Sequence, residues 1–239
     1  MIIQGLQKTT LLDYPEKVAC TMFTGGCNFR CPFCHNASLV VDRGNIVPIE
    51  SQKNGDYTEE EIFTFLNKRR GILDGVCITG GEPMIQSDLE EFIQKIKNLG
   101  FLVKLDTNGS FPDRLKNMID SGIIDYVAMD IKNSKEDYGK TIGVKNYNTD
   151  KIERSVDILM EGKIPYEFRT TVVREFHTEE NIYKIREWIK GAEQYYLQQF
   201  VDSGDVIKSG LHGVDVNELH RWRDILSENI AKVELRGVE

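Results

Sequence analysis

Cysteine and tryptophan are scarce in this chain, which has five cysteines and two tryptophans among its 239 residues. Residues 1–10 lack a charged segment followed by an apolar one, so no signal peptide is evident. No apolar run reaches the roughly 18 residues of a transmembrane helix, so we expect no membrane partner. We predict a cytoplasmic protein whose cysteines are free thiols, which suit metal binding better than disulfide formation.

Positive charge is also in short supply, with 30 lysines and arginines against 38 aspartates and glutamates, a net charge of −8. No basic run or aromatic-rich stripe offsets this balance, so nucleic acid is disfavoured as a partner. The 40% of hydrophobic residues can form a sizeable core. Because repeats, low-complexity segments and long linkers are absent, we predict a single domain over residues 1–239.

Three of the few cysteines are crowded together as Cys27, Cys31 and Cys34. Thiolates are the soft ligands that iron–sulfur clusters and zinc select, and a [4Fe–4S] cluster usually takes four of them. The other two cysteines, Cys20 and Cys77, lie within apolar runs and are expected to be buried. Three thiolates would leave one iron open, and an open metal position is where a small molecule can bind and react.

Two other interpretations of the three cysteines stay open. A zinc site could use them together with His35, although side chains adjacent in sequence rarely reach one tetrahedral metal. A disulfide pair with a spare thiol is the second, and it suits a secreted protein better than this one.

Apolar runs and helix-start signals alternate along the chain. Predicted strands cover residues 17–23, 75–79, 101–106, 125–131, 166–173 and 195–201. Predicted helices begin near residues 58, 87, 112, 149, 178 and 216, the first two with capping boxes. Residues 1–15 and 40–57 are predicted to be irregular.

Strands that alternate with helices indicate βαβ units and a parallel sheet, hence the α/β class. Six such units are fewer than a full (β/α)8 barrel requires. We therefore predict a partial (β/α)6 TIM-like barrel with parallel strands. An open doubly wound sheet is the alternative.

Polar residues follow or end the first four predicted strands and lie within the last two, and parallel α/β folds bind ligands at the carboxyl ends of their strands. In chain order they are Cys27, Cys31 and Cys34; Gly80, Gly81 and Glu82; Asp106 and Asn108; Asp130 and Lys132; Arg169; and Gln198 and Gln199. The glycines let backbone approach a ligand closely, and their carbonyls can accept from an ammonium group. Asp130 and Lys132 share a face of an extended strand end, where a carboxylate suits ribose hydroxyls and an ammonium suits a carboxylate.

Two runs of sequence resemble a known family. The run from Cys27 to Asn36, with an aromatic residue before the last cysteine, resembles the radical S-adenosylmethionine (SAM) enzymes. More narrowly, it is similar to the activating proteins of glycyl radical enzymes. The opening run from Gly5 to Pro15 resembles the branch that activates anaerobic ribonucleotide reductase. Gln198 and Gln199 depart from the pyruvate formate-lyase activases, which carry a histidine near that position.

The resemblance implies the same partial barrel and two cofactors, one [4Fe–4S] cluster on the three cysteines and SAM. The implied contacts to SAM or its surroundings are Phe33, His35, Asn36, Gly80, Gly81, Glu82, Asp106, Asn108, Asp130, Lys132 and Arg169. Asp106 and Asn108 match a turn that in some members lies near a monovalent cation, and an ordinary Asn-Gly turn is the alternative. Arg169 could equally form a structural salt bridge. Three isolated histidines, His177, His212 and His220, are expected on surfaces or helix faces.

The implied activity is reductive cleavage of SAM, followed by removal of a glycine Cα hydrogen from a partner enzyme. That partner is expected to be anaerobic ribonucleoside-triphosphate reductase, with flavodoxin or ferredoxin as the electron donor. Pyruvate formate-lyase activation is one alternative. A radical SAM enzyme acting on a small molecule, such as a carboxy-deazaguanine synthase, is another, and a non-catalytic metal-binding module is the third.

Overall fold

The computed structural model describes residues 1–40, 57–202 and 204–238. The predicted irregular segment 40–57 falls almost entirely outside the described residues. The chain forms two compact units, each built from several stretches of sequence. Unit 1 comprises Met1–Asn28, Ser38–Thr107 and Asp113–Val127, and unit 2 comprises Phe29–Ala37, Asn108–Pro112 and Ala128–Glu239.

Unit 1 is a sheet whose helices follow its parallel strands. Its strands are β1 (Ile3–Thr10), β2 (Ala19–Thr24), β3 (Gly75–Gly80) and β4 (Leu102–Thr107). β2, β3 and β4 pair in parallel, whereas β1 pairs antiparallel with β2. The helical elements are η1 (Ala37–Leu39), α1 (Glu59–Arg69), η4 (Pro83–Ile85), α2 (Leu89–Asn98) and α3 (Pro112–Asp120).

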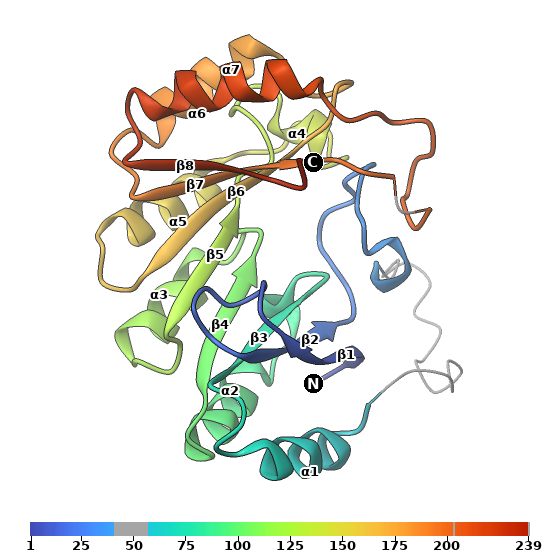
Figure 1. The fold of residues 1–239 in the computed structure, drawn as a ribbon, viewed down its shortest axis with the longest axis vertical. Coiled ribbons are helices and arrows are strands. Elements are labelled where there is room, and N and C mark those ends of the chain that lie inside the picture. The colour runs from blue at the N-terminus through green and yellow to red at the C-terminus, as the bar shows by residue number, and fades with distance from the viewer. Residues whose placement is uncertain (41–56, 203, 239) are drawn as a thin grey trace. The chain divides into compact units, whose positions relative to one another are not determined.

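Unit 2 repeats the same alternation after β5 (Tyr126–Asp130), in which the chain passes from one unit to the other. Its further strands are β6 (Tyr166–Val172), β7 (Gln194–Gln199) and β8 (Lys232–Arg236), which pair in parallel. Its helices are α4 (Tyr138–Thr141), α5 (Asp150–Met160), α6 (Glu179–Trp188) and α7 (Val216–Ser227). Figure 1 shows α6 and α7 side by side over β7 and β8.

In each unit, hydrogen-bonded strands are neighbours in the chain as well. A barrel wall is wound in this consecutive order, whereas a doubly wound sheet reverses its strand order at a switch point. The predicted α/β class with barrel-type winding is therefore confirmed, and the doubly wound alternative is wrong. All six predicted strands are present as β2 to β7.

Two strands were missed, and both lie near the ends of the chain. Residues 1–15 were predicted to be irregular, but residues 3–10 form β1, whose exposed middle and glycine conceal the usual apolar signal. β8 reads Lys-Val-Glu-Leu-Arg, an alternation with period two that could have revealed it.

Of the two predicted capping boxes, one is confirmed. Thr58 Oγ1 accepts from Glu61 N at 3.2 Å, and Thr58 N donates to Glu61 Oε2 at 2.8 Å. At the start of α2, Asp88 occupies the cap position without a side-chain capping bond. Its carboxylate instead pairs with the amino group of Met1, so this second prediction was wrong.

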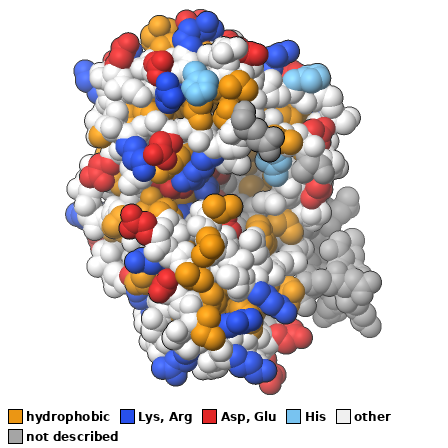
Figure 2. Space-filling view, viewed as in Figure 1, with side chains coloured by type: hydrophobic (Ala, Val, Ile, Leu, Met, Phe, Trp, Pro, Cys, Tyr) orange, Lys and Arg blue, Asp and Glu red, His pale blue; other side chains and the backbone are white. Residues whose placement is uncertain are grey.

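The cores are formed by the inward faces of the strands and the helices packed on them. Cys20 and Cys77 are fully buried, as predicted. Figure 2 shows acidic, basic and apolar side chains interspersed on the face in view, without an extended field of one sign. No helix within the described residues is long and apolar enough to cross a membrane.

Candidate active site

The turn that follows β3 in unit 1 packs backbone against backbone. Gly81 N donates to Thr24 O at 2.9 Å, and Glu82 N donates to Gly26 O at 2.8 Å. A Cβ atom on Gly81 would lie 1.9 Å from Gly26 O, and Gly80 has a φ of +119°. The turn therefore requires both glycines. Because the first cysteine of the trio follows Gly26 directly, these bonds hold the beginning of the cysteine loop against the end of β3.

Glu82 acts within the protein rather than at its surface. Its side chain is fully buried, and Oε1 accepts from Met84 N at 3.1 Å and from Thr107 Oγ1 at 2.9 Å. These bonds cap η4 and tie it to the end of β4. The side chain thereby fixes the glycine turn in place.

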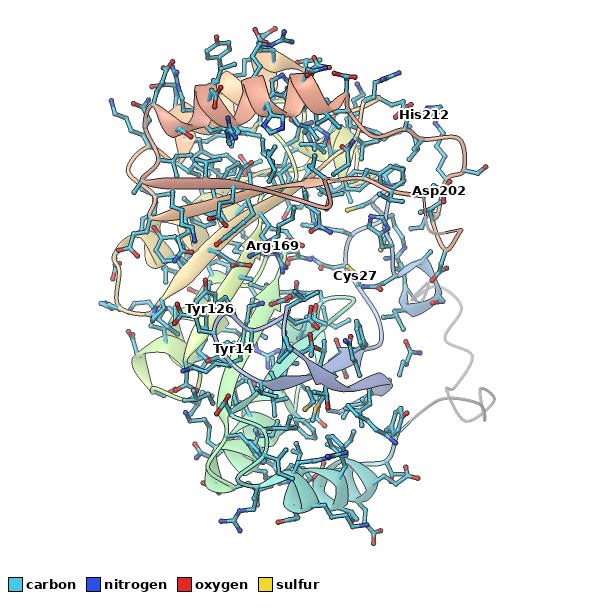
Figure 3. All side chains as sticks on the ribbon, viewed as in Figure 1. Tyr14, Cys27, Tyr126, Arg169, Asp202 and His212 are labelled. Carbon is cyan, nitrogen blue, oxygen red and sulfur yellow. The ribbon has the colours of Figure 1, made fainter. Side chains whose placement is uncertain are left out.

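Asp106 lies at the end of β4 in an ion pair with Lys104, whose side chain is 1% exposed. The sulfur of Cys77 lies 3.7 Å from Asp106 Oδ1 and 3.9 Å from Lys104 Nζ. The sequence analysis missed Lys104, although a lysine within the apolar run Leu-Val-Lys-Leu was a signal for a paired buried charge. Beside this pair, the rings of Tyr14 and Tyr126 lie 6.0 Å apart (Figure 3).

Asn108 follows β4 and belongs to unit 2. It forms an ordinary Asn-Gly turn, which the sequence analysis gave as the alternative to a cation site. Its Oδ1 accepts from Ser110 N at 2.9 Å and from Ser110 Oγ at 2.6 Å. Gly109 has a φ of +77°, which completes the turn.

The rest of the cysteine loop belongs to unit 2, where it rests on the segment after α4. Arg30 N donates to Ile142 O at 2.9 Å, and Cys34 N donates to Cys31 O at 3.0 Å. A Cβ atom on Gly143 would lie 2.4 Å from Arg30 O, so the two segments are in close backbone contact. This contact sets the course of the loop between its first and second cysteines.

None of the three loop cysteines forms a disulfide. Burial raises the pKa of Cys34, and a backbone hydrogen bond from Asn36 and the charge of Lys132 oppose that rise. Within the described residues, no three His, Cys, Asp or Glu side chains are grouped closely enough to hold one metal ion. The mononuclear zinc alternative gains no support from this arrangement. In a [4Fe–4S] cluster, each cysteine binds a different iron, so such close grouping is not needed.

Two aromatic residues beside Cys34 pack inside unit 2. Phe33 is buried, with its ring 5.7 Å from that of Phe176. His35 lies 5.2 Å from the ring of Phe200, and its buried Nε2 has no hydrogen-bond partner among the described residues. Burial, followed by the charge of Lys132, lowers the pKa of His35, so its ring is neutral near pH 7. An unpaired ring nitrogen beside an aromatic face suits a planar heterocyclic ligand.

Asp130 and Lys132 at the end of β5 and Arg169 in the middle of β6 form a charged group. Lys132 Nζ lies 2.8 Å from Asp130 Oδ2, and Arg169 Nε lies 3.0 Å from Asp130 Oδ1. Burial alone would raise the pKa of Asp130, but the two cations outweigh it and lower that pKa to about 2. Burial alone would lower the pKa of Lys132. The negative charges of Asp130 and of the Cys31 and Cys34 sulfurs outweigh that effect and raise the pKa. The predicted shared face of Asp130 and Lys132 is confirmed.

The ion pairs extend from Arg169, labelled in Figure 3, to further charged residues on β6 and β8. Glu167, buried on β6, lies 3.9 Å from Arg169 Nη1 and accepts two bonds from Arg236 on β8, at 2.9 and 3.0 Å. Arg169 therefore forms a structural salt bridge, which was one of its two predicted roles. It remains a candidate for the other role, binding a ligand.

His177 was expected on a surface or helix face, and that prediction was wrong. Its side chain is buried, with Nδ1 accepting from Val173 N at 3.0 Å and Nε2 donating to Lys132 O at 2.9 Å. It therefore holds the backbone that carries Lys132. His212 is exposed and pairs with Glu175 at 2.8 Å (Figure 3), and His220 is exposed as well.

Comparison with known proteins matches the Radical SAM superfamily profile to residues 21–189. This chain belongs to the radical SAM superfamily. A Methanocaldococcus jannaschii protein, provisionally named a glycyl-radical enzyme activating enzyme, is 31% identical over 99% of this chain and 96% of its own length. Radical SAM enzymes use a [4Fe–4S] cluster and SAM, so both predicted cofactors are confirmed.

Two solved structures support the fold. A domain of pyruvate-formate lyase-activating enzyme from Bacteroides vulgatus matches 68% of this chain and 99% of its own length, with 17% identity and a TM-score of 0.53. Streptococcus suis SuiB bound to precursor peptide SuiA matches 90% of this radical SAM chain and 47% of its own, with 15% identity and a TM-score of 0.65. At these identities the likeness shows a common fold alone, and it agrees with the predicted partial barrel.

Proposed function

We propose that this radical SAM protein is an activase that forms a glycyl radical on a partner enzyme, namely anaerobic ribonucleoside-triphosphate reductase. One observation carries the proposal: the end-to-end similarity to a relative provisionally named a glycyl-radical enzyme activating enzyme. The choice of reductase rests on the opening run from Gly5 to Pro15 and on the glutamines of β7. A SuiB structure that contains a precursor peptide supports the idea that this fold can admit a polypeptide.

The cysteines present fit an iron–sulfur cluster. In this proposal Cys27, Cys31 and Cys34 hold it, because none of the three is in a disulfide and their spacing suits a cluster. The positive charge of Lys132, felt by the second and third sulfurs, favours their thiolate forms. When bound, the cluster and SAM supply the homolytic chemistry that produces a carbon radical.

The chain's own residues bind and orient SAM in this proposal. The carbonyls of the glycine turn accept from its amino group, and Lys132 pairs with its carboxylate. Asp130 stays ionised at neutral pH because of its two cations, and it can accept from ribose hydroxyls. The remaining assigned contacts are Phe33, His35, Asn36, Glu82, Asp106, Asn108 and Arg169, with Glu82 acting through the turn that it caps.

The test is to mix anaerobically reconstituted protein, SAM and a one-electron reductant with candidate partners. We expect a glycyl radical signal in electron paramagnetic resonance with the reductase, and 5′-deoxyadenosine as product. Cys31→Ala should abolish both products, whereas Cys20→Ala, which changes a buried cysteine outside the trio, should retain them. A radical formed only on pyruvate formate-lyase would reassign the partner. Turnover of a small-molecule substrate without any protein radical would replace the activase proposal.

A further inference from the structure

Two glycines, Gly25 and Gly26, lead directly into Cys27, the first cysteine of the loop, which Figure 3 labels. Gly25 N donates to Ile2 O at 3.2 Å, just before β1 begins. Gly26 N donates to Leu39 O at 2.7 Å, at the end of η1. All of these residues belong to unit 1, so the main chain before Cys27 is tied to two other segments of that unit.

The carbonyl groups of the same two glycines are paired as well. Gly26 O accepts from Glu82 N, which is a main-chain contact like the two above. Gly25 O accepts from a side chain instead, the amide of Gln86, whose Nε2 lies 2.7 Å away. Three of these four bonds join main chain to main chain, and the fourth depends on residue type. A substitution at Gln86 can therefore remove one bond and leave the other three in place.

The carboxamide of Gln86 bridges Ile2 and the start of the cysteine loop. Its Oε1 accepts from Ile2 N at 3.3 Å, while its Nε2 donates to Gly25 O. The amide offers an acceptor to the N–H group and a donor to the carbonyl, so these two contacts fix its orientation. Gln86 is 9% exposed and Gly25 is buried, so water has little access to replace the bond between them.

The main chain of Gln86 is also held in place. Gln86 N donates to Pro83 O at 3.0 Å, where η4 ends. Gln86 O accepts from Arg114 Nη2 at 2.9 Å, and the same guanidinium, on α3, forms an ion pair with Glu90 on α2. A side chain whose backbone is anchored on both sides can keep its amide at a fixed point.

We propose that Gln86 is a positioning residue for the cysteine loop: its side-chain amide fixes Gly25, and with it the main chain that leads into Cys27. The proposal rests on the proposed role of Cys27 as an iron ligand. Glycine is the most flexible residue type, so two glycines in a row would let the chain pivot just before this ligand. Fixing them in advance lowers the conformational entropy that is lost when the thiolate binds iron, which strengthens binding. Gln86 acts through Gly25 rather than as a ligand itself.

The first experiment follows iron release from the anaerobically reconstituted protein, without SAM, reductant or partner enzyme. Gln86→Met has nearly the size of the native side chain but cannot donate to Gly25 O. An excess of EDTA should remove iron from it about tenfold faster than from wild type, as expected when a buried carbonyl loses its partner. Gln94→Met is the matched control, because Gln94 is an exposed glutamine of the same unit, paired with Asn98 at 3.1 Å. A wild-type rate in Gln86→Met, or faster release from both variants, would overturn the proposal.

Two further variants in the same assay separate positioning from general stability. Gln86→Glu, at alkaline pH where its carboxyl group is ionised, still accepts from Ile2 N but cannot donate to Gly25 O, so it should release iron as fast as Gln86→Met. Ile93→Val removes a buried methylene group of α2 and lowers stability away from the loop, so it should keep the wild-type rate. A wild-type rate in Gln86→Glu, or fast release from Ile93→Val, would contradict the role of the bond to Gly25.

The reduced cluster gives a second readout, which a loss of stability alone does not change. Its electron paramagnetic resonance spectrum should be shifted in Gln86→Met and identical to wild type in Ile93→Val. A wild-type spectrum in Gln86→Met would limit Gln86 to a packing role and overturn the proposal. No glycyl radical enzyme is present in either experiment. A protein that passes both but forms no glycyl radical would refute the proposed function and leave the role of Gln86 standing.

Discussion

The glycine turn of unit 1 and the charged group of unit 2, Asp130 with Lys132 and Arg169, are held together by different kinds of contact. The turn is held by main-chain contacts so close that one added Cβ would lie 1.9 Å from a carbonyl oxygen. The charged group is held by ion pairs of 2.8 and 3.0 Å between flexible side chains. Backbone contacts cannot adjust to a larger residue, whereas side-chain charges can be removed one at a time. A single substitution in the turn should therefore cause a large loss in the free energy of unfolding, whereas each substitution in the charged group should cause a smaller one.

The largest effect is expected for Gly81→Ala. The new methyl group overlaps Gly26 O, so the turn must move and the free energy of unfolding should fall by about 3 kcal/mol or more. Gly5→Ala is the matched control in the same unit, because its Cβ would meet the Phe23 side chain at 3.2 Å. Urea denaturation should show a loss below about 1 kcal/mol for that control. Equal losses in the two variants would contradict the importance of the close backbone contact.

Asp130→Asn should have the next largest effect. Removing the carboxylate leaves Lys132 and Arg169 facing each other, and the lowered pKa of Asp130 corresponds to about 2 kcal/mol of stability at neutral pH. Asp120→Asn removes an exposed carboxylate paired with Lys116, and its effect should stay within about 0.5 kcal/mol. Chemical denaturation of both variants checks the difference. A control as destabilised as Asp130→Asn would show that burial adds nothing to the pair.

The pH dependence of the free energy of unfolding should report the ionisation of Asp130. Because the pKa of Asp130 is lower in the folded protein than in the unfolded chain, its contribution is present above about pH 4. It should be lost as the pH falls from about 4 toward 2, by up to about 2 kcal/mol. In Asp130→Asn this component of the acid-induced loss should disappear. Parallel stability curves for wild type and variant between pH 5 and 2 would argue against the assignment.

The smallest expected effect concerns His177→Phe. Phenylalanine fills the space but leaves Lys132 O and Val173 N without their side-chain partner, at a cost on the order of 1–2 kcal/mol. Because the Lys132 backbone loses its support, SAM affinity measured by equilibrium dialysis should fall as well. His177→Gln, which keeps a donor, should recover part of that affinity. Unchanged affinity in His177→Phe would limit the residue to a packing role.

The sequence analysis found the strands that position the candidate site residues, because apolar runs and the glycines that follow some of them are local signals. It also found the Asp130–Lys132 pair, since alternation along a strand places both on one face. It missed β1 because the middle of that strand is exposed and polar. It missed the role of His177 because the partner is the main chain of Lys132, 45 residues away. Nothing near a lone histidine in the sequence reports such a contact.

The chain's sequence by itself determined the α/β class, the cysteine spacing that indicates an iron–sulfur cluster, and the polar residues at the strand ends. These features depend on neighbours within a few residues, where local geometry follows from residue type. Only the tertiary structure decided that Asp106 pairs with buried Lys104, that Gly81 must be glycine because Gly26 lies against it, and that His177 supports the main chain of Lys132. Those relations join segments far apart in the chain, and they arise only when packing brings the segments together.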